Sequence, residues 1–460
     1  RAVAIKEVEL NEIEAQWSKL VEELEQLSQG NEERQKQLQS DYIEQLQEIS
    51  KLTNQEKHLE RSMEQNQNQH DKLLEKQELF EEQSKQLDQK IAQLVEKEEN
   101  LAQRTSSKQE DLNTFRQQAD SLRQERQTLQ EQKQKIESVK KAILSELQAS
   151  PHDAIIFTSS GSEGNNLVFE SIREHFAKEK GHIIVSGVEH PSVRKPAEFI
   201  AEEGFDVTYL APNKDGIVTV SQVEKALRED TRLVSIMTVN NETGVRFPIE
   251  EIAALLKETP VLFHTDAVQA FAQEELNVDG IDYLTASGHK IYAPKGIGFL
   301  YKSKDAPLHA LIKGGGQELG FRAGTENVPY ILGFEKAMQI VVAAREELVK
   351  TYQELQEYLM DKLTQKGIEF EMNGISNPKN PHICNIWLKG RKATQTLIFN
   401  DLKDVSISAG SACSAGSVQI SPVLSAMYPG ENSRLEESIR LSFGMGSTKK
   451  DIDAFVDAFR

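Results

Sequence analysis

The segment around Lys290 places three reactive residue types in one turn. Leu284 to Gly298 reads LTASGHKIYAPKGIG, so a serine, a histidine and a lysine follow directly after an expected strand. A lysine amine held in a pocket loses its proton more readily than in water and forms a Schiff base with a carbonyl compound. For a single lysine taken alone, a solvated position on the surface remains the commoner outcome.

Asp266 ends another expected strand and is a candidate partner for a cationic ring nitrogen. It lies in Phe263–Gln269, which reads FHTDAVQ, with Gln269 three positions later. A carboxylate at the end of a strand pairs with a protonated nitrogen or caps the helix that follows, and this motif alone favours the cap. His264, in the same strand, is expected to be structural.

A third segment, Phe157–Asn166, is a candidate phosphate site. It reads FTSSGSEGNN, in which a strand ends and a turn rich in glycine and serine opens a helix. Such a turn presents backbone N–H groups and hydroxyls, which suit a phosphate group. It matches neither GxxxxGK[ST] nor GxGxxG, so an ordinary structural turn fits this segment equally well.

The chain has two cysteines in contrasting settings. Cys413 lies in Ser406–Gly416, SISAGSACSAG, and the segment SIRLSFG with Arg440 follows at Ser438–Gly444. Cys384 lies in the apolar run ICNIW and is expected in the core. A buried apolar position is the usual one for a free cysteine, but the polar, glycine-rich setting of Cys413 does not favour it.

Composition excludes several classes of protein. The chain has 54 basic and 73 acidic residues, a formal net charge of −19, which argues against general nucleic-acid binding and against anionic membrane surfaces. No apolar run is long enough to cross a bilayer, and no signal peptide is visible. The two cysteines argue against a disulfide scaffold and favour a reducing, cytoplasmic setting. The histidines show no metal-ligand spacing, so no metal is expected.

The composition changes near Pro151. Residues 1–150 hold one of the 26 glycines and none of the 13 prolines, and their apolar residues recur with a heptad rhythm. Such a stripe is typical of a helix that pairs with another helix. We therefore expect a coiled coil over 1–138, formed with a second chain or by folding back near Gly30 or Gln65–His70.

After Pro151, short β-branched runs alternate with amphipathic helical stretches, a pattern that predicts a mostly parallel sheet with helices on both faces. The loops at the carboxyl ends of such strands carry the chemistry. The expected strands are Ala154–Thr158, His182–Ser186, Val207–Leu210, Leu233–Val239, Val261–Thr265 and Gly298–Tyr301. From about Val349 the chain is expected to form a smaller α+β domain.

These motifs, in this order, resemble the fold-type-I pyridoxal-phosphate enzymes of the class V aminotransferase group, and within it the cysteine desulfurases of the NifS/IscS type. The resemblance covers about Lys140 to Arg460, and the segments around Cys413 and Arg440 are its most specific part. More loosely, Asp41–Ile49 resembles the coiled-coil arm of bacterial condensin-like ATPases, although no Walker A motif is present. The domains expected are a coiled coil at 1–138, a cofactor-binding α/β domain at 139–348 and a small domain at 349–460.

The resemblance implies a role for each residue of the site. Lys290 would carry pyridoxal 5'-phosphate, Asp266 would pair with its ring nitrogen, and His190 would stack on the ring and move protons. Cys413 would be the nucleophile, as a thiolate. Further residues would bind the phosphate (Gly161, Ser162, Ser287, His289 and, from the neighbouring subunit, Thr325), the ring hydroxyl (Asn241, Gln269) and the substrate carboxylate (Arg440, with Asn241 beside it). The family commonly has threonine where Ser162 stands, a mild change.

The implied reaction removes sulfur from L-cysteine, giving L-alanine and a persulfide on Cys413 that passes to an iron–sulfur scaffold or a tRNA-thiolation enzyme. Thr325 implies a homodimer. The family's opening segment, which covers the active site, has no counterpart here, which implies an authentic core with impaired turnover as one outcome. Alternatives are another class V reaction, such as selenocysteine lysis or transamination, and a coiled-coil scaffold with an inactive enzyme domain.

Overall fold

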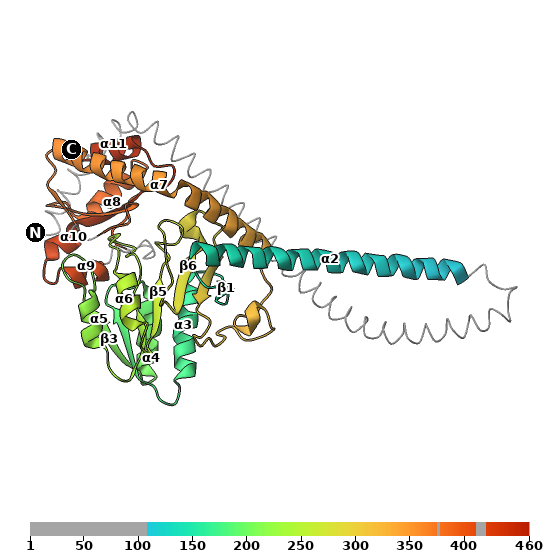
Figure 1. Ribbon diagram of the computed structural model, residues 1–460. Helices are drawn as coiled ribbons and strands as arrows, with labels where there is room; N and C mark the ends of the chain where they lie inside the picture. Colours follow the sequence, from blue (N-terminus) through green and yellow to red (C-terminus); the bar gives the residue numbers. More distant parts are fainter. Residues whose placement is uncertain (1–107, 375–377, 411–419, 460) are drawn as a thin grey trace, which may run out of the picture.

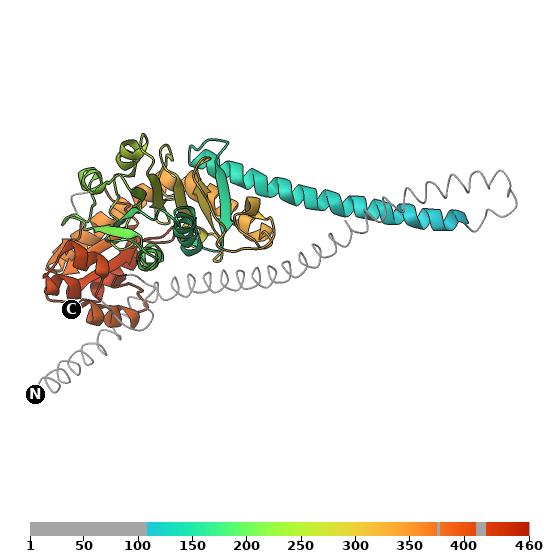
Figure 2. The ribbon, with the colours of Figure 1, turned by 90° about the horizontal axis from the view of Figure 1, so that it is seen from below.

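The computed structural model describes residues 108–374, 378–410 and 420–459. The expectations for 1–107, which include most of the coiled coil and the condensin-like resemblance, lie outside the described residues. Helix α2 (Lys108–Glu146) projects from the body of the molecule (Figures 1 and 2). Residues 115–128 of this helix are exposed, whereas Ile136, Val139 and Ile143 are buried against the enzyme body. The expected boundary at 138/139 therefore lies inside one helix that joins the two parts.

A seven-stranded sheet forms the centre of the body, in the order β1-β7-β6-β5-β4-β2-β3. All its strands run parallel except β7, which pairs antiparallel with both β1 and β6. The strands are β1 (Ala154–Thr158), β2 (His182–Ser186), β3 (Asp206–Leu210), β4 (Thr231–Ser235), β5 (Leu262–Asp266), β6 (Tyr283–Ser287) and β7 (Gly298–Lys302). This sheet with its helices is the mostly parallel architecture that the sequence predicts.

Helices cover both faces of the sheet, because the strands are apolar on both sides. In β1, Ile155 and Phe157 point into one hydrophobic cluster and Ile156 into the other, as strand alternation requires. Helices α3 (Gly161–His175) and α4 (Pro191–Glu202) pack on one face. The other face is covered by the end of α2, α5 (Val220–Ala226), α6 (Ile249–Leu256) and the first part of α7 (Val328–Gln365).

Strand β4 is shorter than expected and ends at Ser235 instead of Val239. The backbone continues beside β5 in an irregular path, with Ile236 N donating to His264 O at 3.1 Å and Thr238 N donating to Asp266 O at 2.9 Å. This path carries Met237 and Asn241 to the carboxyl end of β5. The other strands predicted from the sequence lie within one residue of their expected bounds.

The C-terminal part contains a three-stranded antiparallel sheet in the order β10-β9-β8. Its strands are β8 (Phe370–Met372), β9 (Ile383–Leu388) and β10 (Ser438–Ser442), and its helices are α8 (Ala393–Asp401), α9 (Pro422–Met427), α10 (Asn432–Glu437) and α11 (Lys449–Asp457). The second half of α7, β9, β10 and α11 share a separate hydrophobic cluster. The expected boundary at 348/349 lies within α7, which contacts both clusters. Within the described ranges, no helix is long and apolar enough to span a bilayer.

Candidate active site

A cavity of about 190 Å³ lies at the carboxyl ends of β1, β5 and β6. It brings together most of the residues singled out from the sequence. Its lining includes Gly161, Ser162, His190, Asn241, Asp266, Gln269, Ser287, His289, Lys290 and Arg440. Thr325 is not part of this lining, and Cys413 lies outside the described residues. Parallel strands end at the same edge of a sheet, which is why motifs more than 100 residues apart converge here.

The N-terminus of α3 forms one wall of the cavity. The Ser160 side chain caps this helix by accepting from Glu163 N at 3.3 Å, and the first turn leaves backbone N–H groups without partners inside the helix. Gly161 fits so closely that a Cβ would come within 2.7 Å of the Val268 side chain. The backbone of this turn therefore borders the cavity directly, as a site for an anion requires.

Asp266 is a buried carboxylate at the floor of the cavity, with 5% of its surface exposed. Its two oxygens accept hydrogen bonds from Asn165 Nδ2 at 2.8 Å and from Val268 N at 2.9 Å. Burial raises the pKa of Asp266, while these bonds and the nearby His190 and Lys290 act in the opposite direction. A cationic group placed in the cavity would therefore stabilise the ionised carboxylate.

Asn165 and Ser192 connect Asp266 to His190, and the sequence motifs did not assign a role to either. Asn165 Nδ2 also donates to Ser192 Oγ at 2.9 Å, and Ser192 Oγ lies 2.8 Å from His190 Nδ1. Asn165 comes four residues after Gly161, so the two share one face of α3, which is the signal that sequence offered. Ser192 has only the weak signal of its position in the first turn of α4.

His190 is held in one tautomer by this network. Its Nδ1 accepts a hydrogen bond from Ser192 N at 3.1 Å, in the manner of an N-cap, so the proton of the neutral ring lies on Nε2. Burial lowers the pKa of His190; the nearby Asp266 carboxylate acts in the opposite direction, and Lys290 adds to the lowering. The ring is therefore neutral at pH 7 and presents an apolar face with an Nε2–H donor.

Lys290 lies in a 3-10 helix, Gly288–Ile291, directly after β6. The backbone of this turn is fixed by Gln273 Nε2, which donates to Lys290 O at 3.1 Å. Ser287 Oγ and His289 Nδ1 lie 2.8 Å apart in the same turn. The three residue types that the sequence placed together thus line the same cavity.

Arg440 and Asn241 close the side that faces the small sheet. Arg440 Nη1 donates to Asn241 O at 2.8 Å. The Asn241 loop turns at Gly244, where φ is 73° and a Cβ would lie 3.0 Å from the carbonyl oxygens of Asn380 and Ile383. Glycine thus lets this loop pack directly on the start of β9.

A second cavity of about 260 Å³ adjoins the first on the side of α7. Both cavities share Asn241, Gln269, His289, Lys290 and Arg440 as lining residues. The second one adds Tyr352, His382 and Phe443, and His382 Nε2 lies 3.3 Å from Gln269 Oε1. Lys290 therefore borders both cavities.

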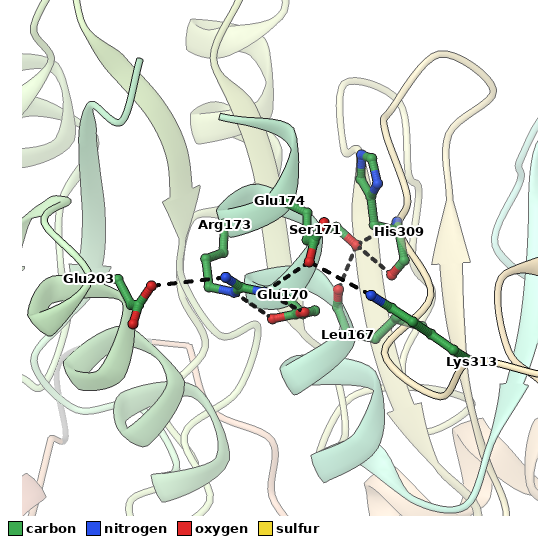
Figure 3. A network of polar contacts seen from close by, with 8 residues as sticks. All are labelled: Leu167, Glu170, Ser171, Arg173, Glu174, Glu203, His309 and Lys313. Atoms are coloured by element: carbon green, nitrogen blue, oxygen red, sulfur yellow. Dashed lines mark hydrogen bonds and ion pairs between the residues drawn. The ribbon is translucent and has the colours of Figure 1, made fainter. Parts of the chain in front are cut away.

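The loop that carries Thr325 is fastened to α3 at two points. Near the cavity, Arg322 Nε pairs with Glu163 Oε1 at 2.9 Å. At the other end of the helix, Figure 3 shows a polar network in which Ser171 Oγ accepts from His309 N at 3.0 Å and Lys313 pairs with Glu174 at 3.8 Å. This fixes the loop on the outside of α3. The predicted contact of Thr325 with a neighbouring subunit's phosphate stays a prediction.

Cys384 lies in the core, as the sequence predicted. It is fully buried in the small-sheet cluster, and burial raises the pKa of its thiol to about 12. The protonated thiol is unsuited to nucleophilic attack. His264 is also buried, bonded to Ser235 Oγ at 2.8 Å, and burial lowers its pKa to about 3, in keeping with a structural role. Among the described residues, no cluster of His, Cys, Asp or Glu suits a metal ion.

Comparison with known proteins identifies the family. Residues 105–455 match the family model for class-V aminotransferases, so the chain belongs to the class V aminotransferase family. Over 312 residues it is 44% identical to a putative cysteine desulfurase, IscS 1, from Bacillus subtilis, an alignment that covers 67% of this chain and 82% of that protein.

Solved structures agree with this assignment. A NifS-like protein superposes with a TM-score of 0.65 at 30% identity, covering 71% of this chain and 86% of that one. The protein SspA, solved in complex with cysteine, gives a TM-score of 0.59 at 35% identity over 68% of this chain and 88% of its own. Cysteine desulfurases of this family use pyridoxal phosphate.

The residues of the cavity fit that cofactor. The α3 turn, whose glycine leaves no room for a Cβ, suits the phosphate, and the buried Asp266 carboxylate suits a protonated ring nitrogen. The Lys290 amine lines the same cavity and suits the aldehyde. The flat face of His190, which also lines it, suits the ring itself.

Proposed function

We propose that this chain is a cysteine desulfurase, which converts L-cysteine to L-alanine and leaves the sulfur as a persulfide on Cys413. The observation that carries the proposal is the convergence of Lys290, Asp266, His190 and Arg440 on one cavity at the carboxyl edge of the sheet. The relatives that match most of the chain carry the same activity in their names. The family membership and this geometry support the same reaction.

The charged residues of the cavity and His190 each have a task in this proposal. Bound pyridoxal phosphate supplies an electron sink for the α-carbon of the amino acid. Asp266 keeps the ring nitrogen protonated, and Asn165 keeps Asp266 aimed at it. Arg440 binds the substrate carboxylate through its guanidinium. The Lys290 amine would hold the aldehyde of the cofactor and would move the proton at the α-carbon of the substrate. His190 packs on the ring and donates from Nε2.

Sulfur transfer is proposed for Cys413. The thiolate attacks the substrate sulfur, a new S–S bond forms, and the C–S bond of the substrate breaks with its electrons moving to carbon. That carbon takes up a proton and leaves as the methyl group of alanine. The buried Cys384, with its raised pKa, is not a candidate for this step.

Replacement of each cysteine tests this assignment. We expect Cys413→Ala to lower alanine and sulfide release from cysteine by at least about a thousandfold, because the nucleophile is lost. The yellow cofactor band should remain. Cys384→Ala is the matched control and should retain release. Wild-type release by Cys413→Ala would contradict the role of Cys413, and selenide release from selenocysteine without alanine from cysteine would favour the selenocysteine alternative.

The remaining assignments are also proposals. We propose a homodimer in which Thr325 reaches the partner's phosphate, since its loop is held outside its own cavity by Arg322 and Glu163. A scaffold protein for iron–sulfur assembly or a tRNA-thiolation enzyme would accept the sulfur. A reducing compartment such as the cytoplasm would keep Cys413 a thiol. We divide the chain into a coiled coil (1–138), a cofactor-binding domain (139–348) and a small domain (349–460), with α2 and α7 as the continuous connections.

A further inference from the structure

Glu242 is a buried carboxylate directly next to the cavity, and the mechanism above gives it no task. Only 2% of its surface is exposed, and it follows Asn241, which lines both cavities. Its backbone is fixed from two sides, since Glu242 N donates to Asn240 Oδ1 at 2.9 Å and Asn385 Nδ2 donates to Glu242 O at 3.0 Å. The side chain therefore projects from a rigid position.

The carboxylate of Glu242 meets the residues on both sides of segment 411–419. Ser421 Oγ donates to Glu242 Oε2, and the same hydroxyl accepts from Leu424 N at 3.0 Å as the cap of α9. Gly410 lies beside the same oxygen, so that a Cβ there would come within 3.5 Å of both Glu242 Oε2 and Ser421 Cβ. Glu242 thus binds Ser421, the second residue described after the segment, and lies next to Gly410, the last residue described before it.

The same cluster includes Arg440. Its backbone pairs with Ser408 through Arg440 N to Ser408 O at 2.6 Å and Ser408 N to Arg440 O at 3.1 Å, and Ser408 Oγ donates to Gly410 O at 3.1 Å. The Arg440 guanidinium holds Asn241 O. Burial raises the pKa of Glu242, while the bond from Ser421 and the charge of Arg440 act in the opposite direction. Glu242 therefore connects the side of the cavity formed by Asn241 and Arg440 to Gly410 and Ser421.

We propose that Glu242 is a positioning residue for sulfur transfer, whose carboxylate fixes Gly410 and Ser421, on either side of segment 411–419, relative to Arg440. The inference rests on the proposed function only in naming Cys413 as the acceptor of sulfur. The inference requires that loss of the Glu242 carboxylate slow the transfer of sulfur and leave the binding of cofactor and substrate nearly unchanged.

The experiment compares Glu242→Ala and Glu242→Gln in the full-length protein. With cofactor bound, the absorbance change caused by cysteine reports substrate binding, and mass spectrometry reports persulfide on Cys413. We expect Glu242→Ala to keep the absorbance change and to lower the rate of persulfide formation by about tenfold or more, the loss of one hydrogen bond to a charged group. Glu242→Gln keeps an acceptor oxygen for Ser421 and should stay within about threefold of wild type.

A second readout needs no cofactor. In the cofactor-free protein, we expect protease cleavage within 411–419 to be at least about fivefold faster in Glu242→Ala than in wild type, with cleavage elsewhere unchanged, because local opening becomes easier. Glu437→Ala is the matched control, since Glu437 is a buried carboxylate of the same region that binds Trp387 Nε1 and Gly390 N. It should lower overall stability without either effect.

The outcomes separate the two proposals. An unchanged rate of persulfide formation in Glu242→Ala, or an equal fall in the absorbance change, would overturn the role of Glu242. If wild type forms no persulfide on Cys413, the proposed function fails, and the cleavage rates still decide whether Glu242 anchors the segment. If Glu242→Ala does not fold, Ser421→Ala removes the partner hydroxyl instead. This variant must then keep the absorbance change caused by cysteine and form persulfide more slowly.

Discussion

One cavity lies at the amino ends of the parallel strands, and the candidate site lies at their carboxyl ends. The larger cavity is the one at the amino ends, and it is not the candidate site. The cavity at the amino ends of the strands has a volume of about 460 Å³, against about 190 Å³ and about 260 Å³ for the two adjoining cavities that Lys290 lines. It is lined by several carboxylates, among them Asp153, Asp279 and Asp282. Volume and acidity alone would favour the larger cavity as a site.

The hydrogen bonds distinguish the two cavities. Asp153 accepts from Tyr301 Oη at 2.9 Å and Lys304 N at 2.8 Å, and Asp282 accepts from Phe263 N and from Ser303 Oγ. Asp279 pairs with Lys257 at 2.7 Å. These carboxylates tie loops to strand ends. In the smaller cavity, Asp266, His190 and Lys290 line one space, and such a convergence of reactive groups is more typical of a functional site than a large volume is.

Loss of the Lys290 amine should have the largest effect on activity of the changes considered. We expect Lys290→Ala to lower desulfurase activity by at least about a thousandfold, since no other amine of the chain is predicted to hold the cofactor. The protein given pyridoxal phosphate should show no yellow band that borohydride fixes in place. Absorbance spectra before and after borohydride, together with alanine release, measure this. A reducible band that persists in the variant would disprove the assignment of Lys290.

The buried Asp266 and the half-buried Asp282 offer a pair for comparison. We expect Asp266→Asn to lower kcat by about a hundredfold or more, because a neutral amide cannot keep the ring nitrogen protonated. Asp282→Asn, at the opposite cavity, should leave kcat within about twofold and lower the melting temperature by a few degrees through weaker hydrogen bonds to Phe263 N and Ser303. Steady-state kinetics and thermal unfolding of both variants suffice. Equal effects on kcat would remove the distinction between the cavities.

A smaller effect is expected from the buried carboxyl group behind Asp266. Glu189 is 2% exposed, its Oε1 accepts from Met237 N at 2.8 Å, and burial raises its pKa well above the ordinary value. Because the pKa of Glu189 is higher in the folded protein than in the unfolded chain, the folded protein keeps the proton up to a higher pH. The free energy of unfolding therefore falls as the pH rises from the unfolded-state pKa through the folded-state pKa. Glu189→Gln should remove this fall.

The measurement is the melting temperature of both proteins at pH 6 and at pH 9. Between pH 6 and pH 9, the melting temperature of wild type should fall by about 2 °C or more beyond the fall in Glu189→Gln. Glu437→Gln serves as a control at a buried carboxylate whose Oε2 accepts hydrogen bonds from Trp387 and Gly390. Identical pH dependence in wild type and Glu189→Gln would show that Glu189 is ionised in the folded protein.

Much of the fold follows from local pattern. Strands β1 and β2 have the expected bounds because β-branched runs flanked by turn residues favour strands. The sequence did not reveal that β7 inserts antiparallel between β1 and β6, because its run of apolar residues is compatible with either direction. Nor did it reveal that single helices, α2 and α7, cross the expected domain boundaries.

The site was predictable where residues lie in a motif at the end of a strand. Gly161, Asp266 and Lys290 belong to this group, and the parallel sheet places such ends at one edge. Asn165 and Ser192 were not predictable, because an amide or a hydroxyl on a helix is common and only its partner makes it functional. The partner of Asn165 at Asp266 lies 101 residues away.

The sequence by itself determined the reactive residue types and their local settings: an amine in a turn after a strand, a glycine turn before a helix and a heptad stripe that continues into α2. Only the tertiary structure decided which of these act together. Glu242 and Ser421 lie 179 residues apart and meet because the small sheet packs against the Asn241 loop. Such contacts arise when distant segments bury a common core. The hydrogen-bond partner of a polar residue cannot be predicted from the local sequence pattern.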